Sequence, residues 1–359
     1  MELGTKFPAL HEWEAGTKQP TLKQLEKFAQ ATHTPIGYLF LPEPPDESLP
    51  VPDFRTIGDI EIGHASPDLL DTVYQCQQRQ EWFREYARLH RESPVSFVGT
   101  LTTAKDVVQA AREMRATLAY EPAERGPSWS EAARRLITEA DEHGVLVMVS
   151  GIVGSNTHRK LDPDEFRGFA LSDDLAPLIF VNGADTKAAQ IFTLAHELAH
   201  LWLGESAVSD ADLSTLSTNE TERWCNQVAA EFLVPLEGLR GVVVDHARLT
   251  DELERLAREF KVSTLVVLRR IFDAGLLAQD QYRIAYSEER DRVRALMEEQ
   301  TSSGGNFYNT QPVRVSKRFA RALIESTLEG QTLHRDAFQM LGFKKHATFT
   351  ELAHRLGVA

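Results

Sequence analysis

Residues 192–200, Phe192-Thr193-Leu194-Ala195-His196-Glu197-Leu198-Ala199-His200, contain the pattern HExxH, on which both the fold and the chemistry of this chain depend. Residues four apart lie on one face of a helix, so His196 and His200 can offer their imidazole rings to the same ion. Glu197 follows the first histidine, which directs its carboxylate to the side of the metal where water would bind. The pattern therefore predicts a zinc site with Glu197 as the general base.

The residues around this pattern favour a buried helix over the alternative, two surface histidines on an ordinary helix. Asp185 or Thr186 can cap a helix that runs from Ala188 to about Leu203 and ends at Gly204. An apolar face is supplied by Ile191, Leu194, Ala195, Leu198 and Leu201. Short β-branched runs at 145–149 and 178–181 predict buried strands, and we expect the second to be an edge strand beside the site.

The third metal ligand has to come from another element, and the next predicted helix, 220–233, offers Glu220, Glu222 and Glu231. Glu222 shares a mostly small or apolar stripe with Cys225, Asn226, Ala229 and Leu233, as expected of a helix packed beneath a metal. Glu231 is nine residues further on, about 180° around the helix, so it and Glu222 cannot both face the ion. Asp210 and Asp212 lie in a polar loop and are weaker candidates. We therefore predict zinc ligands His196, His200 and Glu222.

The two predicted helices resemble the ImmA/IrrE family of metallopeptidases. The family pattern of HExxH followed by ExxxNxFAxxLLxP is matched by His196–His200 and by residues 222–235, with Val228 and Phe232 as apolar departures. The resemblance covers roughly residues 140–278. It implies a zincin-like fold, zinc held by His196, His200 and Glu222, and Glu197 as base. It also implies selective cleavage of a regulatory protein, often a helix-turn-helix repressor.

The rest of the chain divides into four further parts, giving an α+β, mostly helical protein. We expect a helix-turn-helix-like segment at 1–42, a proline-rich linker at 43–53 and a helical region at 54–140. The zincin-like domain, a small sheet with the HExxH helix and the glutamate helix, is expected at 141–278. A helical and basic region follows at 279–359.

Composition limits the classes of function. A net charge of -14 over 359 residues argues against a general nucleic-acid binder, and two cysteines cannot form a zinc site of four cysteines. No apolar run approaches the roughly 20 residues that span a bilayer, and the N-terminus lacks a secretory signal. We therefore expect a cytoplasmic protein without a membrane partner.

The N-terminal stretch Leu10–Ala29 resembles the later half of a repressor-type (XRE-like) helix-turn-helix domain, with Trp13-Glu14-Ala15-Gly16 after the recognition helix and Pro20-Thr21 opening the next one. Residues 1–50 contain four lysines, no arginine and seven acids. Such a surface lacks the cations that fix a recognition helix on phosphates, so DNA binding is doubtful. A docking or dimerisation surface is the competing interpretation.

Two further features leave their roles open. A glycine- and aromatic-containing loop, 304–310, precedes Arg314, Lys317, Arg318 and Arg321, which could grip an acidic partner or RNA, although a solvated helix face is the simpler interpretation. Candidates for stabilising an oxyanion are His143, His158 and Tyr282, and none has a spacing that assigns the role.

The sequence thus supports a leading hypothesis and two competitors. The leading one is a site-specific zinc endopeptidase that cleaves a regulatory protein, such as a helix-turn-helix repressor, and so controls gene expression or a stress response. The alternative is a protein-binding regulator of the antitoxin type, paired with a co-encoded toxin. A DNA-binding repressor is the third hypothesis, and the acidic N-terminus makes it the weakest.

Overall fold

The computed structural model describes residues 3–43, 45, 49–53, 56–57, 60–61, 65–209, 219–241, 248–299 and 314–358. These residues are mostly helical and contain one mixed four-stranded sheet. The predicted α+β, mostly helical class is therefore confirmed. No helix in the described part of the chain is long and apolar enough to cross a membrane.

The four-stranded sheet has the order β3-β5-β4-β6. Strands β3 (Leu146–Ser150) and β5 (Leu178–Asn182) are parallel, whereas β4 (Gly168–Leu171) is antiparallel to both β5 and β6 (Ala207–Ser209). The expectation that the strand at 178–181 forms an edge is wrong, because β5 is paired on both sides. The sequence did not indicate β4 and β6, which are too short for a periodic pattern.

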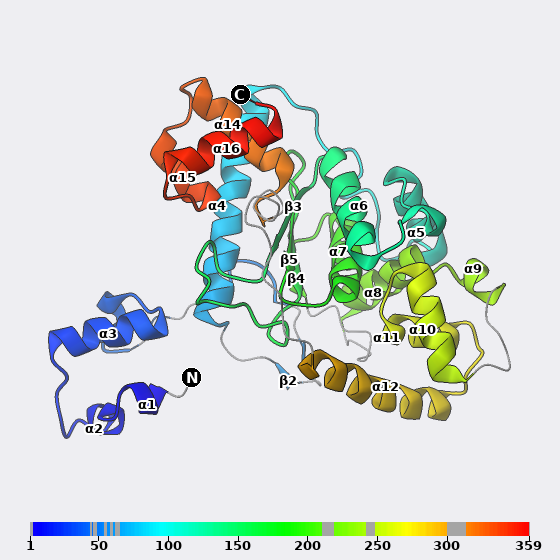
Figure 1. Ribbon diagram of the computed structural model, residues 1–359, viewed down its shortest axis with the longest axis horizontal. Coiled ribbons are helices and arrows are strands. Elements are labelled where there is room, and N and C mark those ends of the chain that lie inside the picture. The colour runs from blue at the N-terminus through cyan, green and yellow to red at the C-terminus, as the bar shows by residue number, and fades with distance from the viewer. Residues whose placement is uncertain are drawn as a thin grey trace.

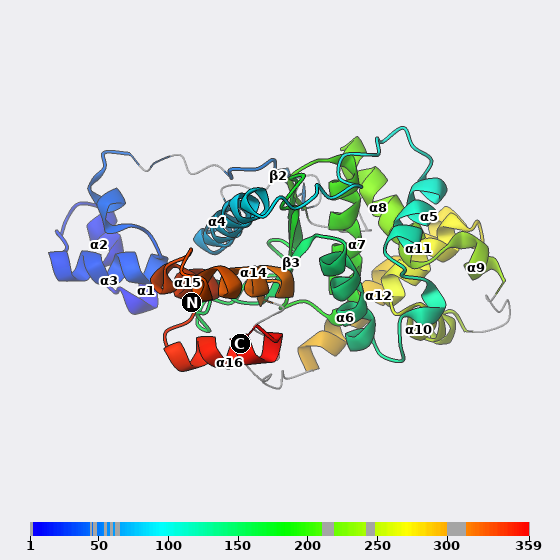
Figure 2. The same ribbon diagram turned by 90° about the horizontal axis from the view of Figure 1, so that it is seen from above.

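Helices cover both faces of the sheet, as the two views in Figures 1 and 2 show. Alternate residues of the strands serve opposite cores: Val147 and Ile179 pack in the cluster that contains the HExxH helix, and Met148 and Phe180 pack in the other. Burial on both faces explains why the strands are continuously apolar. The first layer contains α6 (Trp129–Glu142) and α7 (Lys187–Leu203), and the second contains α4 (Pro67–Leu89), α14 (Lys317–Leu328), α15 (His334–Leu341) and α16 (His346–Leu356).

The capping residues at each end of α7 determine where the helix begins and ends. The Thr186 hydroxyl accepts a hydrogen bond from the Ala189 N–H, which satisfies one of the unpaired donors of the first turn. Gly204 ends the helix with φ +74°, a left-handed conformation that glycine adopts without strain. The helix that carries Glu222, α8 (Glu220–Leu233), is capped at its start by the Asn219 side chain.

Most of the remaining helices lie beyond α7 and α8, away from the sheet, whereas α12 runs beneath them toward β2 (Ile60–Glu61) (Figure 1). They are α5 (Val107–Thr117), the short η2 (Pro122–Glu124), α9 (Leu236–Arg240), α10 (Leu249–Phe260), α11 (Thr264–Asp273) and α12 (Gln279–Glu299). Helix α12 begins at Gln279, the first residue of the predicted C-terminal helical region. The loop 304–310 lies outside the described residues.

The N-terminal helices lie apart from the sheet and its two helical layers (Figures 1 and 2). They share a small aromatic cluster in which Phe7 contacts Trp13 and Phe28, with ring centroids 6.1 and 5.3 Å away. The resemblance of this segment to a helix-turn-helix domain stays a prediction. The elements are α1 (Leu3–Lys6), α2 (Leu10–Glu14), α3 (Leu22–Thr32) and η1 (Ile36–Phe40), followed by a two-stranded hairpin of β1 (Thr56–Ile57) and β2 (Ile60–Glu61).

The end of the proline-rich stretch joins the edge of the main sheet. Asp53 forms a parallel bridge with Val208 of β6, and the Val208 N–H donates to the Pro52 carbonyl at 3.0 Å. Residues 52–53 therefore lie beside β6, on the side opposite to β4.

Candidate metal centre

Three polar side chains of α7 are completely buried. His196, Glu197 and His200 are each 0% exposed. The Nε2 atoms of the two histidines lie 3.0 Å apart, so both rings point to the same place from successive turns of the helix. The predicted i, i+4 arrangement of the two rings is present.

Helix α8 packs against α7 and brings Glu222 to this point. Its Oε2 lies 3.2 Å from His196 Nε2, and its Oε1 lies 3.0 Å from His200 Nε2. Glu222 is 4% exposed, so the three groups form a buried cluster that could hold a metal ion.

The spacing of these atoms fits a small tetrahedral cation. Metal–ligand bonds of about 2.0–2.1 Å at tetrahedral angles separate ligand atoms by about 3.3 Å, close to the distances here. Two imidazoles and one carboxylate are also a donor set that zinc accepts while keeping one position open. Both Glu197 oxygens are buried beside the cluster, with the Ser209 side chain close by.

Burial and neighbouring charges shift the pKa values of Glu222 and Glu197 in opposite directions. Burial alone would raise the pKa of Glu222, but the His196 and His200 imidazoles outweigh it and lower that pKa, so the group is an anion at neutral pH. Burial raises the pKa of Glu197 to about 8, against the opposing effect of His196. Without a cation the group is therefore mostly protonated at neutral pH, and a bound metal ion would lower its pKa.

Two polar residues next to the cluster were not assigned by the sequence analysis. Asn226 lies one turn after Glu222, beside His196, and the Ser209 hydroxyl lies 3.5 Å from His200 Nε2. Asn226 was noted only as part of the helix stripe and family pattern. Ser209 was missed because it belongs to β6, whose three residues gave no strand signal.

A glycine of β4 allows the sheet to approach α7 closely. A Cβ atom at Gly168 would lie 2.6 Å from Thr193 Cγ2, 2.9 Å from the Phe180 carbonyl and 3.2 Å from Glu197 Oε1. Any side chain there would push β4 away from the helix that carries the cluster. The sequence carries no signal for this contact, which depends on non-local pairing.

The other candidate ligands and oxyanion residues lie elsewhere. Glu231 is buried in an ion pair with Arg270, and Glu220 is exposed at the start of α8. His143 and His158 are exposed, and Tyr282 stacks on Phe272 with ring centroids 4.5 Å apart. Asp210 and Asp212 lie outside the described residues.

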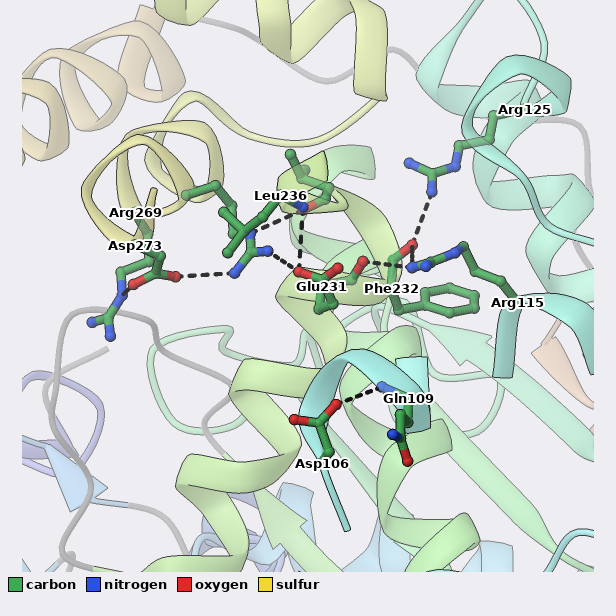
Figure 3. A network of polar contacts seen from close by, with 11 residues as sticks. Asp106, Gln109, Arg115, Arg125, Glu231, Phe232, Leu236, Arg269 and Asp273 are labelled. Carbon is green, nitrogen blue, oxygen red and sulfur yellow. Dashed lines mark hydrogen bonds and ion pairs between the residues drawn. The ribbon is translucent and has the colours of Figure 1, made fainter. Parts of the chain in front are cut away.

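Buried arginines fix the C-terminal end of α8, which fixes the direction of the helix that carries Glu222. Arg115 donates to the carbonyls of Glu231 and Phe232, and Arg125 donates to those of Phe232 and Leu233 (Figure 3). Arg270 Nε donates to the Val234 carbonyl at 2.9 Å. Cations at this position satisfy the last carbonyls of the helix and complement its dipole.

The fold and the cluster together define a class, a mixed helical domain with a buried site that could bind a metal. Residues 140–272 match the family model of the IrrE N-terminal-like domain, of peptidase family M78, and this range contains the whole cluster. Residues 315–355 match a model described as a domain of unknown function, DUF8813. No curated protein matches the chain. Residues 140–272 are thus similar to an M78-type peptidase domain, and helical regions flank them.

Proposed function

We propose that the protein is a zinc-dependent endopeptidase with metal ligands His196, His200 and Glu222 and with Glu197 as the catalytic base. The observation that carries this proposal is the convergence of the three buried donor atoms within a domain that matches a peptidase family. A zinc ion bound there would lower the pKa of a water molecule and polarise the scissile carbonyl.

The residues of the chain then have distinct tasks in peptide hydrolysis. Glu197 accepts a proton as the water oxygen bonds to the carbonyl carbon, and it delivers that proton to the amide nitrogen as the C–N bond breaks. Asn226 and Ser209 add polar side chains beside His196 and His200. The surrounding apolar core excludes bulk water from the carboxylates.

We further propose that the substrate is one regulatory protein, in line with the resemblance to ImmA/IrrE enzymes, and that cleavage occurs in the cytoplasm. Complete burial of Glu197 supports selectivity, because only a peptide that opens a route to the cluster can react. Broad digestion of unfolded chains would need an open cleft.

The test is cleavage of candidate helix-turn-helix regulators by the purified protein with stoichiometric zinc. Glu197→Gln should retain zinc and lose at least about 100-fold in rate, the lower range for a positioned acid–base group. Glu220→Gln, an exposed change on the helix of Glu222, is the matched control and should cleave normally. Equal product formation by Glu197→Gln and wild type would exclude the assigned role.

The same burial also favours the second candidate, a binding regulator in which the cluster stabilises the fold. In that case Glu197→Gln would keep the biological effect in cells, and the effect would depend on complex formation with a co-encoded partner. Loss of the effect in a stable, zinc-loaded Glu197→Gln protein would exclude binding alone.

A further inference from the structure

One outer strand of the main sheet runs past the candidate metal site. This strand, β6, pairs with β4 on one side, and its last residue, Ser209, is 0% exposed with its hydroxyl 3.5 Å from His200 Nε2. The outer side of an edge strand carries backbone N–H and C=O groups that can pair with an extended peptide. A peptide that paired there would bring its backbone next to the buried cluster of His196, His200 and Glu222.

A segment of the same chain already lies along that outer side. The Val208 N–H donates to the Pro52 carbonyl at 3.0 Å, and Asp53 forms a parallel bridge with Val208. Leu49 and Val51 are half-buried and pack against the core on the face of the sheet opposite to α7. Residues 49–53, which we call the strap, are therefore held by this backbone pairing and by two apolar side chains.

The composition of the strap limits how firmly it can pair with β6. Pro50 and Pro52 alternate with the two apolar residues, and proline has no backbone N–H to donate to a neighbouring strand. Position 52 therefore pairs with β6 through its carbonyl alone. Half-buried side chains also stabilise a contact less than fully buried ones, because less apolar area leaves water. The strap can therefore separate from β6 at a lower free-energy cost than β4, which pairs with β6 along consecutive residues.

A covered edge strand can have a simpler function, which is to prevent two copies of the protein from pairing through exposed strands. The position of this edge favours a role in access to the site. The strap covers the strand that ends beside the cluster, and His196, Glu197 and His200 are all 0% exposed. A peptidase has to admit a peptide to its base and its metal ligands, so a segment beside the cluster has to move before a substrate reacts.

We propose that the strap is an autoinhibitory segment, which covers the outer side of β6 and is displaced when a peptide substrate binds there as an extended strand. This proposal rests on the peptidase function proposed above. The Val208 N–H passes from the Pro52 carbonyl to a carbonyl of the peptide, so this backbone hydrogen bond is replaced and not lost. Because the strap connects the N-terminal helices to α4, it stays attached to the chain while displaced and returns after product release.

The strap can be loosened by removing its apolar side chains from the core. In the double variant Leu49→Asn/Val51→Asn both new side chains prefer water, and the backbone of residues 52–53 is unchanged. Hydrogen exchange at the Val208 amide of the full-length protein should then be at least about tenfold faster, since the acceptor of that amide is more often absent. Leu41→Asn, a change at a residue that is 48% exposed and outside the strap, is the matched control and should exchange as wild type does.

Peptide binding to the uncovered edge is measured without cleavage, in a zinc-loaded Glu197→Gln background. The probe is a fluorescein-labelled peptide with the sequence of residues 45–57, which contains the strap, and fluorescence anisotropy follows its binding. The double variant should bind this peptide at least about tenfold more tightly than the protein with an intact strap, because the outer side of β6 is open more often. Equal peptide binding, or equal exchange at Val208, would overturn the strap and leave the peptidase proposal standing.

Cleavage of β-casein, an unstructured protein, by the zinc-loaded chain with Glu197 intact tests the inhibition itself. The double variant should lower KM at least about tenfold and leave kcat within about twofold, because substrate access changes and the catalytic groups do not. An unchanged KM in an active enzyme would refute autoinhibition. If the double variant binds the peptide more tightly but no variant cleaves casein, the strap is supported as the cover of a peptide-binding edge, and the proposed peptidase function is wrong.

Discussion

Replacing Arg125 with Met tests whether the buried arginines at the end of α8 hold the fold together. Arg125 is 1% exposed, and burial lowers its pKa to about 10, so it is still a cation at neutral pH. Its Nη1 donates to the carbonyls of Leu233 at 2.6 Å and Phe260 at 2.8 Å, and its Nη2 donates to the carbonyl of Phe232. It thereby joins the ends of α8 and α10.

The expected loss of stability follows from the hydrogen bonds that those carbonyls accept. The Phe232 carbonyl keeps a second donor, Arg115, so the substitution removes the charged donor chiefly from the carbonyls of Leu233 and Phe260. An unsatisfied buried acceptor costs about 1–3 kcal/mol, so two of them lower the free energy of unfolding by about 2–6 kcal/mol. Methionine is close to arginine in length and limits any additional cavity.

Urea unfolding, followed by tryptophan fluorescence, measures this change. The control is Arg134→Met, whose side chain is 74% exposed and 3.8 Å from Glu131, and which should cost less than about 0.5 kcal/mol. Arg125→Lys should lie between wild type and Arg125→Met, because it keeps a cation but only one donor group. If Arg125→Met and Arg134→Met are equally stable, the arginines do not fix α8.

Three further predictions concern the candidate metal site formed by His196, His200 and Glu222. Glu222→Gln should weaken zinc binding at least tenfold, measured as metal content after dialysis, since the charged ligand is lost while the shape is kept. Chelation by EDTA should lower Tm, and added zinc should restore it, because a metal that binds only the folded state stabilises it; a Tm indifferent to both would argue against a bound metal. Gly168→Ala should cost about 1–3 kcal/mol by overpacking against Thr193 and the Phe180 carbonyl. It should also lower kcat by displacing Glu197, and an enzyme with unchanged kcat would refute the contact.

The features that the sequence predicted well are those set by local interactions. Thr186 and Gly204 mark the two ends of α7, because helix capping and a glycine with positive φ act within one helical turn. Glu222 could be separated from Glu231 because helical periodicity alone places them on opposite faces, and in the structure Glu231 pairs with Arg270. The positions of the two imidazoles follow from the same period.

Non-local pairing explains what could not be predicted. Strands of three or four residues such as β4 and β6 exist because neighbouring strands accept their hydrogen bonds, and no pattern within Ala207–Ser209 reveals that. The close approach of Gly168 to Glu197 depends on the same pairing. The basic side chains near α14 show a similar limit: Arg318 pairs with Glu92 and Arg321 donates to the Leu356 carbonyl, contacts across long sequence separations.

The hydrogen bond between Val208 and Pro52 has a consequence for how tightly any peptide could bind along β6. Strand β6 ends beside the candidate metal site. The pairing position along the free side of β6 is already occupied by residues 52–53 of the same chain. A peptide that lengthens the sheet there has to compete with a tethered segment for the same N–H. Its apparent affinity is then its intrinsic affinity multiplied by the fraction of molecules in which the segment has detached.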